Sequence, residues 1–297
     1  MASYEEKLCE EARLWGGDAI EKAQSIPPDW RFHRALRDNV IMATDQIDAL
    51  LDRVRPGMRT LELGCNAGWL TLAMAQRGAE ATGMDISADA IAIARDYYES
   101  IRDTVSGSAT YEVADLNRVT LPTETYDIIC AKGTLHHLIQ LDHVIDQIYQ
   151  ALKPGALLWV MDANGEETMP AVLIASAITF LLPTEVSYRE KIGGLLRFGL
   201  RAPSRIKASM EAEGLSPFEG MGRSHDWLQL IEKHFTVKER FDHPAVTGYV
   251  TAQLKMPDRI AIPMLRWLYR LDAFFVRRGL LRGTGVTLLA RKPESGE

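Results

Sequence analysis

Short apolar runs alternate with amphipathic helical patterns in the first two thirds of the chain. These runs predict strands near 59–63, 80–84, 109–113, 126–130 and 155–161. Between them, apolar residues at helical spacing predict helices over 68–77, 87–100 and 141–152. Apolar strands that alternate with helices are typical of a parallel sheet covered on both faces. The pattern therefore predicts an α/β fold, a Rossmann-like, doubly wound sheet that is mostly parallel.

Helical patterns flank this core, which we place at residues 56–162. Residues 1–55 predict N-terminal helices, beginning with an amphipathic stretch from Tyr4 to Trp15. Residues 163–223 predict a helical lid insertion. Residues 224–297 predict the last two strands, over 235–242 and 285–292, with a second helical insertion over 258–282. The sheet would then have seven strands, with two helical cap insertions.

The segment TLELGCNAGWLTLA, residues 60–73, has the most informative chemical pattern. An acidic residue, Glu62, lies in the first predicted strand, and Gly64 and Gly68 frame the loop that opens into a helix. Glycines let a backbone pass close to a ligand where a Cβ would collide. The spacing G-x-x-x-G lacks the G-x-G-x-x-G turn that admits a pyrophosphate. A nucleoside ligand without phosphates is therefore favoured.

Two further acidic residues follow predicted strands. Asp85 ends the second strand and Asp115 follows the third. Ligands of open parallel sheets bind at the carboxyl ends of the strands, where a carboxylate can accept both hydroxyls of a ribose. Taken singly, either residue could be a helix cap or a turn residue. Their order behind the glycine loop favours a ligand site.

Together these segments resemble the class I S-adenosylmethionine (SAM) methyltransferases. The glycine loop resembles their motif I, with Asn66 in place of the middle glycine, and YDIICAKGTLHHL resembles motif IV. The resemblance implies SAM as cofactor and S-adenosyl-L-homocysteine as product. It implies that Glu62 and the loop seat the methionine half and the ribose side, Asp85 the ribose, and Asp115 with Leu116 the adenine. The implied cofactor-binding residues are Glu62, Gly64, Cys65, Asn66, Gly68, Trp69, Asp85, Ile86, Asp115, Leu116, Ala131 and Lys132.

His136 and His137 are the candidate catalytic residues. Methyl transfer to a hydroxyl needs alignment and a base, and imidazole titrates near neutral pH. The resemblance places this pair near the transferred methyl, although one of them could simply cap the next helix. His143, six residues after His137, does not share its helical face, and no H-E-x-x-H pattern is present, so no metal site is predicted. Asp162, which ends the fifth strand, could bind a polar acceptor or form a turn.

The resemblance implies a SAM-dependent methyltransferase, an enzyme of class EC 2.1.1, acting on a small-molecule or lipid-linked acceptor. Our first hypothesis is O-methylation of a saccharide or natural product. Motif IV lacks the N/D-P-P-Y/F sequence used on amide or base nitrogens. The alternatives are a non-catalytic SAM-binding partner subunit and an NAD(P)-dependent oxidoreductase, against which the glycine spacing argues. The two helical insertions would then build the acceptor pocket. The N-terminal helices would either help to shape that pocket or only cover an apolar face of the sheet.

Composition and charge limit the classes of substrate and interaction partner that the protein could have. A net charge of −6 argues against a nucleic-acid substrate. The three cysteines lack disulfide or metal spacing and the first residues lack a signal-peptide pattern, so we expect a cytoplasmic protein. Residues 259–282 combine apolar residues at helical spacing with arginines. This pattern suits peripheral membrane contact, packing on the protein's own core, or a homodimer interface.

Overall fold

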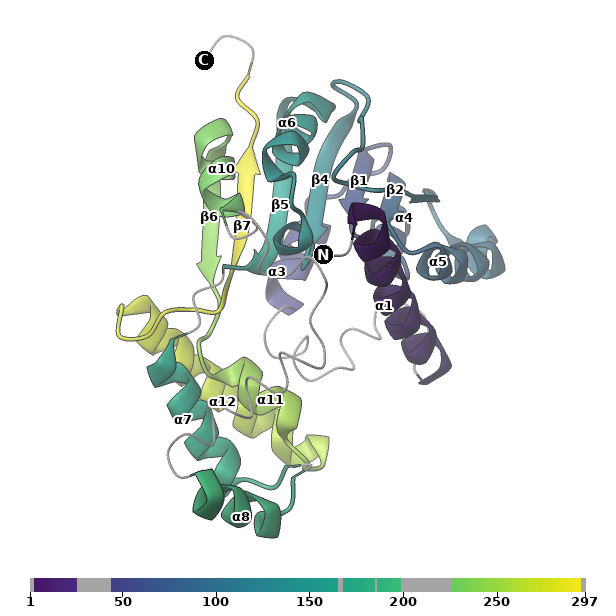
Figure 1. Cartoon of the computed structure of the whole chain (residues 1–297). Coiled ribbons are helices and arrows are strands. Elements are labelled where there is room, and N and C mark those ends of the chain that lie inside the picture. Colours follow the sequence, from purple (N-terminus) through teal and green to yellow (C-terminus); the bar gives the residue numbers. More distant parts are fainter. Residues whose placement is uncertain (1–2, 26–43, 165–167, 185, 199–225, 295–297) are drawn as a thin grey trace.

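A seven-stranded sheet forms the centre of the computed structural model, which describes residues 3–25, 44–164, 168–184, 186–198 and 226–294 (Figure 1). The strands are β1 (Arg59–Leu63), β2 (Glu80–Asp85), β3 (Ser108–Val113), β4 (Tyr126–Lys132), β5 (Leu152–Ala163), β6 (Thr236–Asp242) and β7 (Gly285–Arg291). They are ordered β3-β2-β1-β4-β5-β7-β6. Strands β1 to β5 pair in parallel, and β7 runs antiparallel to β5 and β6. The predicted Rossmann-like, mostly parallel sheet is confirmed.

Helices cover both faces of the sheet, and each face has its own apolar core. The core helices are α3 (Thr44–Leu51), α4 (Trp69–Ala75), α5 (Ala88–Ile101), α6 (Leu141–Ala151) and α10 (Trp227–His234). Side chains alternate along β4, so Ile129 joins the core under α6 and α10, while Ile128 and Cys130 join the core under α3, α4 and α5. This division explains why the central strands β1 and β4 are apolar on both faces.

The remaining helices after β5 form one compact body, which we call the helical subdomain. It comprises α7 (Met169–Leu181), α8 (Tyr188–Phe198), α11 (Thr247–Gln253) and α12 (Asp258–Arg277), and it lies beyond the ends of β5 and β6 (Figure 1). Its core joins Ala171 and Ala175 of α7 to Val250 of α11 and Leu265 of α12. The two insertions that the sequence predicts separately therefore pack against each other.

Several element boundaries differ from the sequence prediction, most of all those of α1 and α12, which ends at Arg277. Helix α1 (Tyr4–Ser25) continues ten residues beyond Trp15. Strand β5 begins at Leu152, three residues early, because the chain stays extended through a bend at which Gly155 has φ 74°. Part of the lid, residues 199–223, and the N-terminal segment 26–43 lie outside the described residues. Within the described chain, no helix has the length and apolarity needed to cross a membrane.

Candidate functional site

A cavity of about 260 Å³ opens at the carboxyl ends of the parallel strands, beneath α1. Eleven of the fourteen predicted site residues line it: Glu62, Gly64, Cys65, Asn66, Trp69, Asp85, Ile86, Asp115, Leu116, Lys132 and His137. The described wall is completed by the loops after β3 and β4 and by one face of α1. The other predicted site residues, Gly68, Ala131 and His136, are not among the lining residues. The fold thus gathers segments that are far apart in the sequence.

The glycine loop has the left-handed backbone that favours glycine. Gly64 and Gly68 have φ of 71° and 77°, and Asn66 between them has φ 47°. A Cβ on Gly64 would lie 2.2 Å from Thr134 Oγ1, and one on Gly68 would lie 2.3 Å from Tyr111 Cε1. Each glycine therefore makes room for a protein side chain. Gly64 also lines the cavity, so the close approach of a ligand at this loop stays a prediction.

Asp85 fits the role of a hydroxyl acceptor in the cavity wall. Its side chain is nearly buried, with 7% exposure, and it accepts the N–H of Asn66 at 2.8 Å and of Ser87 at 2.9 Å. Burial raises the pKa of this carboxyl, while the backbone N–H donors oppose the rise. A carboxylate oxygen can accept more than one hydrogen bond, so both oxygens retain capacity for ligand hydroxyls.

Asp115 holds the first helix across the cavity. Its Oδ2 accepts the Tyr4 hydroxyl at 2.7 Å, and its Oδ1 accepts the N–H of Asn117 at 3.0 Å. Burial, with the neighbouring Asp115 carboxylate, raises the pKa of Tyr4 to about 12, so the phenol stays a donor. Arg118 lies over the Tyr4 ring at 4.2 Å and pairs with Glu5 at 2.8 Å. The sequence offered no signal for this contact, which joins residues 111 positions apart.

Glu62 is buried at the base of the cavity and stabilises the loop. Its carboxyl accepts the backbone N–H of Thr71 at 2.7 Å and also the Thr71 hydroxyl. Burial raises the pKa of Glu62 to about 8. Burial likewise raises the pKa of the Cys65 thiol, which is therefore not a nucleophile at neutral pH. Lys132 brings a positive charge to the same cavity, 5.9 Å from the ring centroid of Trp69.

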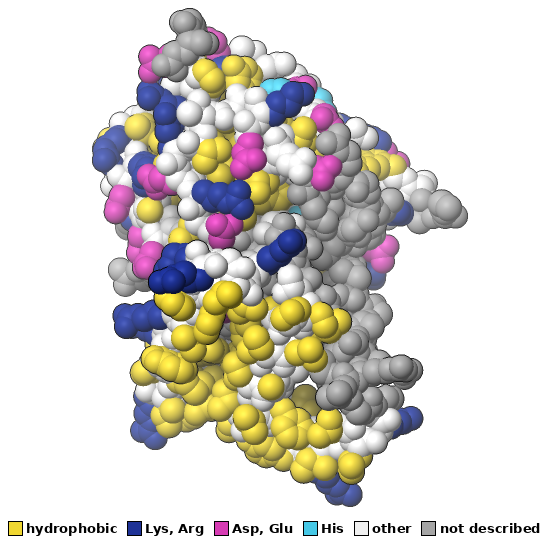
Figure 2. Space-filling view, turned by 90° about the vertical axis from the view of Figure 1, so that its left-hand side faces the viewer, with side chains coloured by type: hydrophobic (Ala, Val, Ile, Leu, Met, Phe, Trp, Pro, Cys, Tyr) yellow, Lys and Arg dark blue, Asp and Glu magenta, His cyan; other side chains and the backbone are white. Residues whose placement is uncertain are grey.

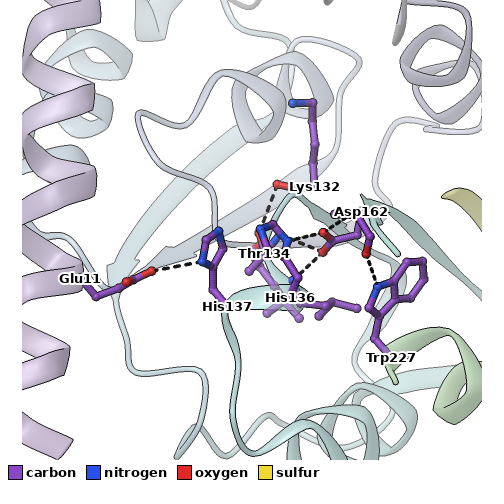
Figure 3. Close-up of polar contacts among 10 residues, drawn as sticks. Glu11, Lys132, Thr134, His136, His137, Asp162 and Trp227 are labelled. Carbon is purple, nitrogen blue, oxygen red and sulfur yellow. Dashed lines mark hydrogen bonds and ion pairs between the residues drawn. The ribbon is translucent and has the colours of Figure 1, made fainter. Parts of the chain in front are cut away.

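Asp162 organises the turn that carries the two histidines (Figure 3). Its carboxylate accepts the N–H groups of Thr134 at 3.0 Å and Leu135 at 2.7 Å, and it contacts His136 Nδ1. The Asp162 side chain has no exposed surface. The buried carboxylate therefore fixes the orientation of His136 and the turn before it. Of the two roles considered for Asp162, this buried position and these contacts favour organising a turn.

His137, in contrast, faces the cavity. Its ring lies 3.9 Å from that of His136, centroid to centroid, and Figure 3 shows Glu11 of α1 approaching it from the opposite side. The distance from His137 Nδ1 to Glu11 Oε1 is 3.6 Å, too long for a direct hydrogen bond. This buried nitrogen has no hydrogen-bond partner within the described structure. Burial, and secondarily His136, lowers the pKa of His137 to about 4.

The described residues contain no group of three or more His, Cys, Asp or Glu side chains arranged to hold a metal ion. The cavity instead combines a buried carboxylate, a neutral imidazole and a lysine. Its described lining comes from α1 and the sheet domain, with Leu8, Glu11, Trp15 and Asp18 as the contributions of α1. Helix α1 therefore shapes the cavity, which is one of the two roles considered for the N-terminal helices. The contribution of the helical insertions to an acceptor pocket stays a prediction, because residues 199–223 lie outside the described residues.

Comparison with known proteins identifies relatives of this chain. Residues 32–182, slightly more than half of the chain, match a family model described as a methyltransferase domain. The chain is 30% identical over 182 residues to the ubiquinone biosynthesis O-methyltransferase of Bordetella avium, covering 59% of this chain and 69% of that protein. It is 26% identical over 208 residues to the human mitochondrial ubiquinone biosynthesis O-methyltransferase. That match covers 65% of this chain and 54% of the human protein, so the chain spans about half the human protein's length.

A solved structure supports the fold. An S-adenosylmethionine-dependent methyltransferase from Mesorhizobium loti superposes with a TM-score of 0.50 and 19% identity. The match covers 84% of this chain and 96% of that one. It therefore extends beyond the family model into the C-terminal strands and the helices between them.

Proposed function

Because the chain belongs to the class I SAM-dependent methyltransferase family, we propose that the cavity beneath α1 binds SAM and that the protein methylates a hydroxyl oxygen of a small or lipid-linked molecule. When bound, SAM supplies an electrophilic methyl group on a sulfonium sulfur. Membership of this family removes the NAD(P)-dependent alternative. The observation that carries the proposal is the nearly buried Asp85 carboxylate beside the glycine loop, in the wall of the cavity.

The cavity has polar groups suited to both ends of an adenosyl ligand. Asp85 would accept the ribose hydroxyls, and Asp115 with Leu116 would hold the adenine. The loop from Gly64 to Gly68 would hold the methionine half, near the positive charge of Lys132. The buried Glu62 acts through Thr71, whose hydrogen bonds fix the start of α4.

We assign the acceptor side to His137. Its low pKa keeps the imidazole neutral at physiological pH, and a neutral imidazole that lines the cavity can accept the proton of an acceptor hydroxyl. His136 lies behind it and is held by the buried Asp162, so we assign His136 to positioning. Of the two predicted catalytic histidines, this proposal therefore keeps His137 as the base and gives His136 a positioning role.

The acceptor class is argued from the relatives and from α1. Both curated relatives described above are named as O-methyltransferases of ubiquinone biosynthesis, which favours a hydroxyl on an apolar or lipid-linked compound. Leu8 and Trp15 add apolar surface to the described cavity wall. A saccharide acceptor is the second hypothesis, and the transfer assay described next tests it as well.

A transfer assay tests this proposal. We would incubate the full chain with methyl-labelled SAM and a panel of phenols with and without a prenyl chain, monosaccharides, and RNA as a control. We expect label in the ether of a hydroxylated acceptor, identified by mass spectrometry, and none in RNA. SAM binding without transfer to any acceptor, together with activation of a second methyltransferase, would instead identify a non-catalytic subunit.

A further inference from the structure

The exposed apolar surface of the molecule is concentrated on the helical subdomain. Fourteen of the seventeen exposed large apolar side chains in the described chain belong to it: Met169, Leu173, Ile174, Leu181, Val186, Tyr188, Ile192, Leu195, Leu196, Ile260, Trp267, Leu271, Phe274 and Leu280. Figure 2 shows hydrophobic side chains covering the lower half of one face, with Lys and Arg at the edges, while the upper half carries Asp and Glu interspersed with Lys and Arg. Soluble monomers rarely expose apolar patches of this extent, so the surface is a candidate interface.

Helix α12 has three distinct faces along its length. One face packs inside the subdomain through Ala261, Leu265, Asp272 and Ala273. A second face is exposed and apolar, and consists of Ile260, Trp267, Leu271 and Phe274. A third, next to it, is a row of exposed arginines at helical spacing: Arg259, Arg266, Arg270 and Arg277. Trp267 is 65% exposed, although an aromatic ring of this size is usually covered.

The charge of the subdomain is opposite to that of the chain. Residues 169–198 and 247–282 contain ten Lys and Arg but four Asp and Glu, in a chain of net charge −6. Asp272 is buried and accepts the N–H groups of Val246 and Thr247, each at 2.7 Å, so this carboxylate caps α11 and adds no surface charge. The apolar surface therefore lies in a basic environment on an otherwise acidic molecule.

We propose that this surface docks on an anionic lipid membrane, with α12 lying in the plane of the interface. An exposed apolar face beside a row of arginines is the arrangement of an interfacial helix, whose apolar side chains enter the acyl boundary while its cations meet anionic headgroups. Arg278 lies 5.0 Å from the ring centroid of Phe274, which places a cation beside an apolar anchor. A two-fold dimer in which two copies of α12 run antiparallel across this face would bring the two arginine rows together, which is electrostatically unfavourable.

Vesicle binding tests this proposal without reference to methyl transfer. We would measure flotation of the full chain with vesicles of phosphatidylcholine, with and without phosphatidylglycerol. We expect binding to the anionic vesicles, weakened by salt, and a blue shift of tryptophan fluorescence as Trp267 leaves water. Trp267→Phe should retain binding but lose most of the shift, since the other described tryptophans are buried or half-buried.

Two variants separate the apolar and basic parts of the surface. We expect the pair Trp267→Glu with Phe274→Glu to weaken binding at least about tenfold, because it removes two apolar anchors and adds negative charge. We expect the same loss from the fourfold Arg→Gln change at positions 259, 266, 270 and 277. The matched controls lie on the sheet domain: Val113→Glu, which is also an exposed apolar residue, and the fourfold Gln change at Arg59, Arg102, Lys233 and Lys238.

Two measurements show that the surface variants are folded: they should bind SAM as wild type does, and they should unfold at the same temperature. The proposal would be overturned if the control variants lost as much vesicle binding as the surface variants. Equal binding of the wild type to neutral and anionic vesicles would also overturn it. An absence of vesicle binding would also overturn it. If the chain then formed dimers, and the Trp267→Glu with Phe274→Glu pair dissociated them, the surface would be an interface between two copies of the chain. A failure of methyl transfer alone would affect only the proposed function.

Discussion

The two adjacent histidines show how strongly residue roles depend on environment. The sequence predicted both as candidates of equal standing at the end of the fourth strand. The structure separates them, because Asp162 holds His136 whereas His137 lines the cavity. That difference could not be predicted, since Asp162 and Glu11 reach the pair from a distant strand and from α1.

We predict that His137→Ala lowers kcat at least about tenfold and leaves the Kd for SAM nearly unchanged, because the base is lost but the cofactor groups remain. The neutral imidazole, whose pKa is about 4, should give a turnover that does not fall between pH 8 and pH 6. An ordinary histidine would be half protonated near pH 6.5 and turnover would fall. His234→Ala, on α10, is the control. Full activity of the His137 variant, or a midpoint near pH 6.5, would contradict the assignment.

Residue prediction succeeded where topology alone places the side chain. Asp85 and Asp115 were expected at the same edge because parallel strands end together, and both line the cavity. The sequence did not predict the closest protein neighbours of Gly64 and Gly68, which are Thr134 and Tyr111, because these come from other strands and loops. A motif shows that backbone space is needed, but it does not show what fills that space.

At the scale of elements, the sheet order and most helices followed from hydrophobic periodicity, whereas α1 did not. The prediction placed an amphipathic stretch at Tyr4 to Trp15, and the two residues that follow are glycines, which weaken helices. The helix continues because Gly16 lies against α5, where a Cβ would be 2.8 Å from Ser87 Oγ. The glycine therefore permits close packing of two helices. Tertiary packing overrides local propensity at this point.

We predict that Tyr4→Phe loosens α1 by removing its hydrogen bond to Asp115. A hydrogen bond to a charged group contributes about 1.5–3 kcal/mol, so amide hydrogen exchange in α1 should rise about tenfold or more. Exchange in α6, on the other side of the sheet, should stay unchanged. Tyr188→Phe on α8 is the matched control, because its hydroxyl also donates one hydrogen bond, to Leu181 O at 2.9 Å. Equal exchange in α1 for both variants would show that Tyr4 does not hold it.

At the scale of the whole molecule, the sequence predicted a core with two helical insertions but not their association. Periodicity marks each helix, whereas the contact of α7 with α11 and α12 joins segments that are far apart in the sequence. That association creates the surface on which the membrane proposal depends. A cytoplasmic location and a homodimer remain predictions from the sequence.

The central claim is that the cavity beneath α1 binds SAM through Asp85, and calorimetric titration of the full chain with SAM tests it most directly. We predict that wild type binds SAM and does not bind NADH. Asp85→Ala and Asp85→Asn should weaken SAM binding about a hundredfold, because buried hydroxyls lose their charged acceptor. The exposed Asp96→Ala should bind like wild type. Unchanged affinity in the Asp85 variants, or binding of NADH in place of SAM, would contradict the account.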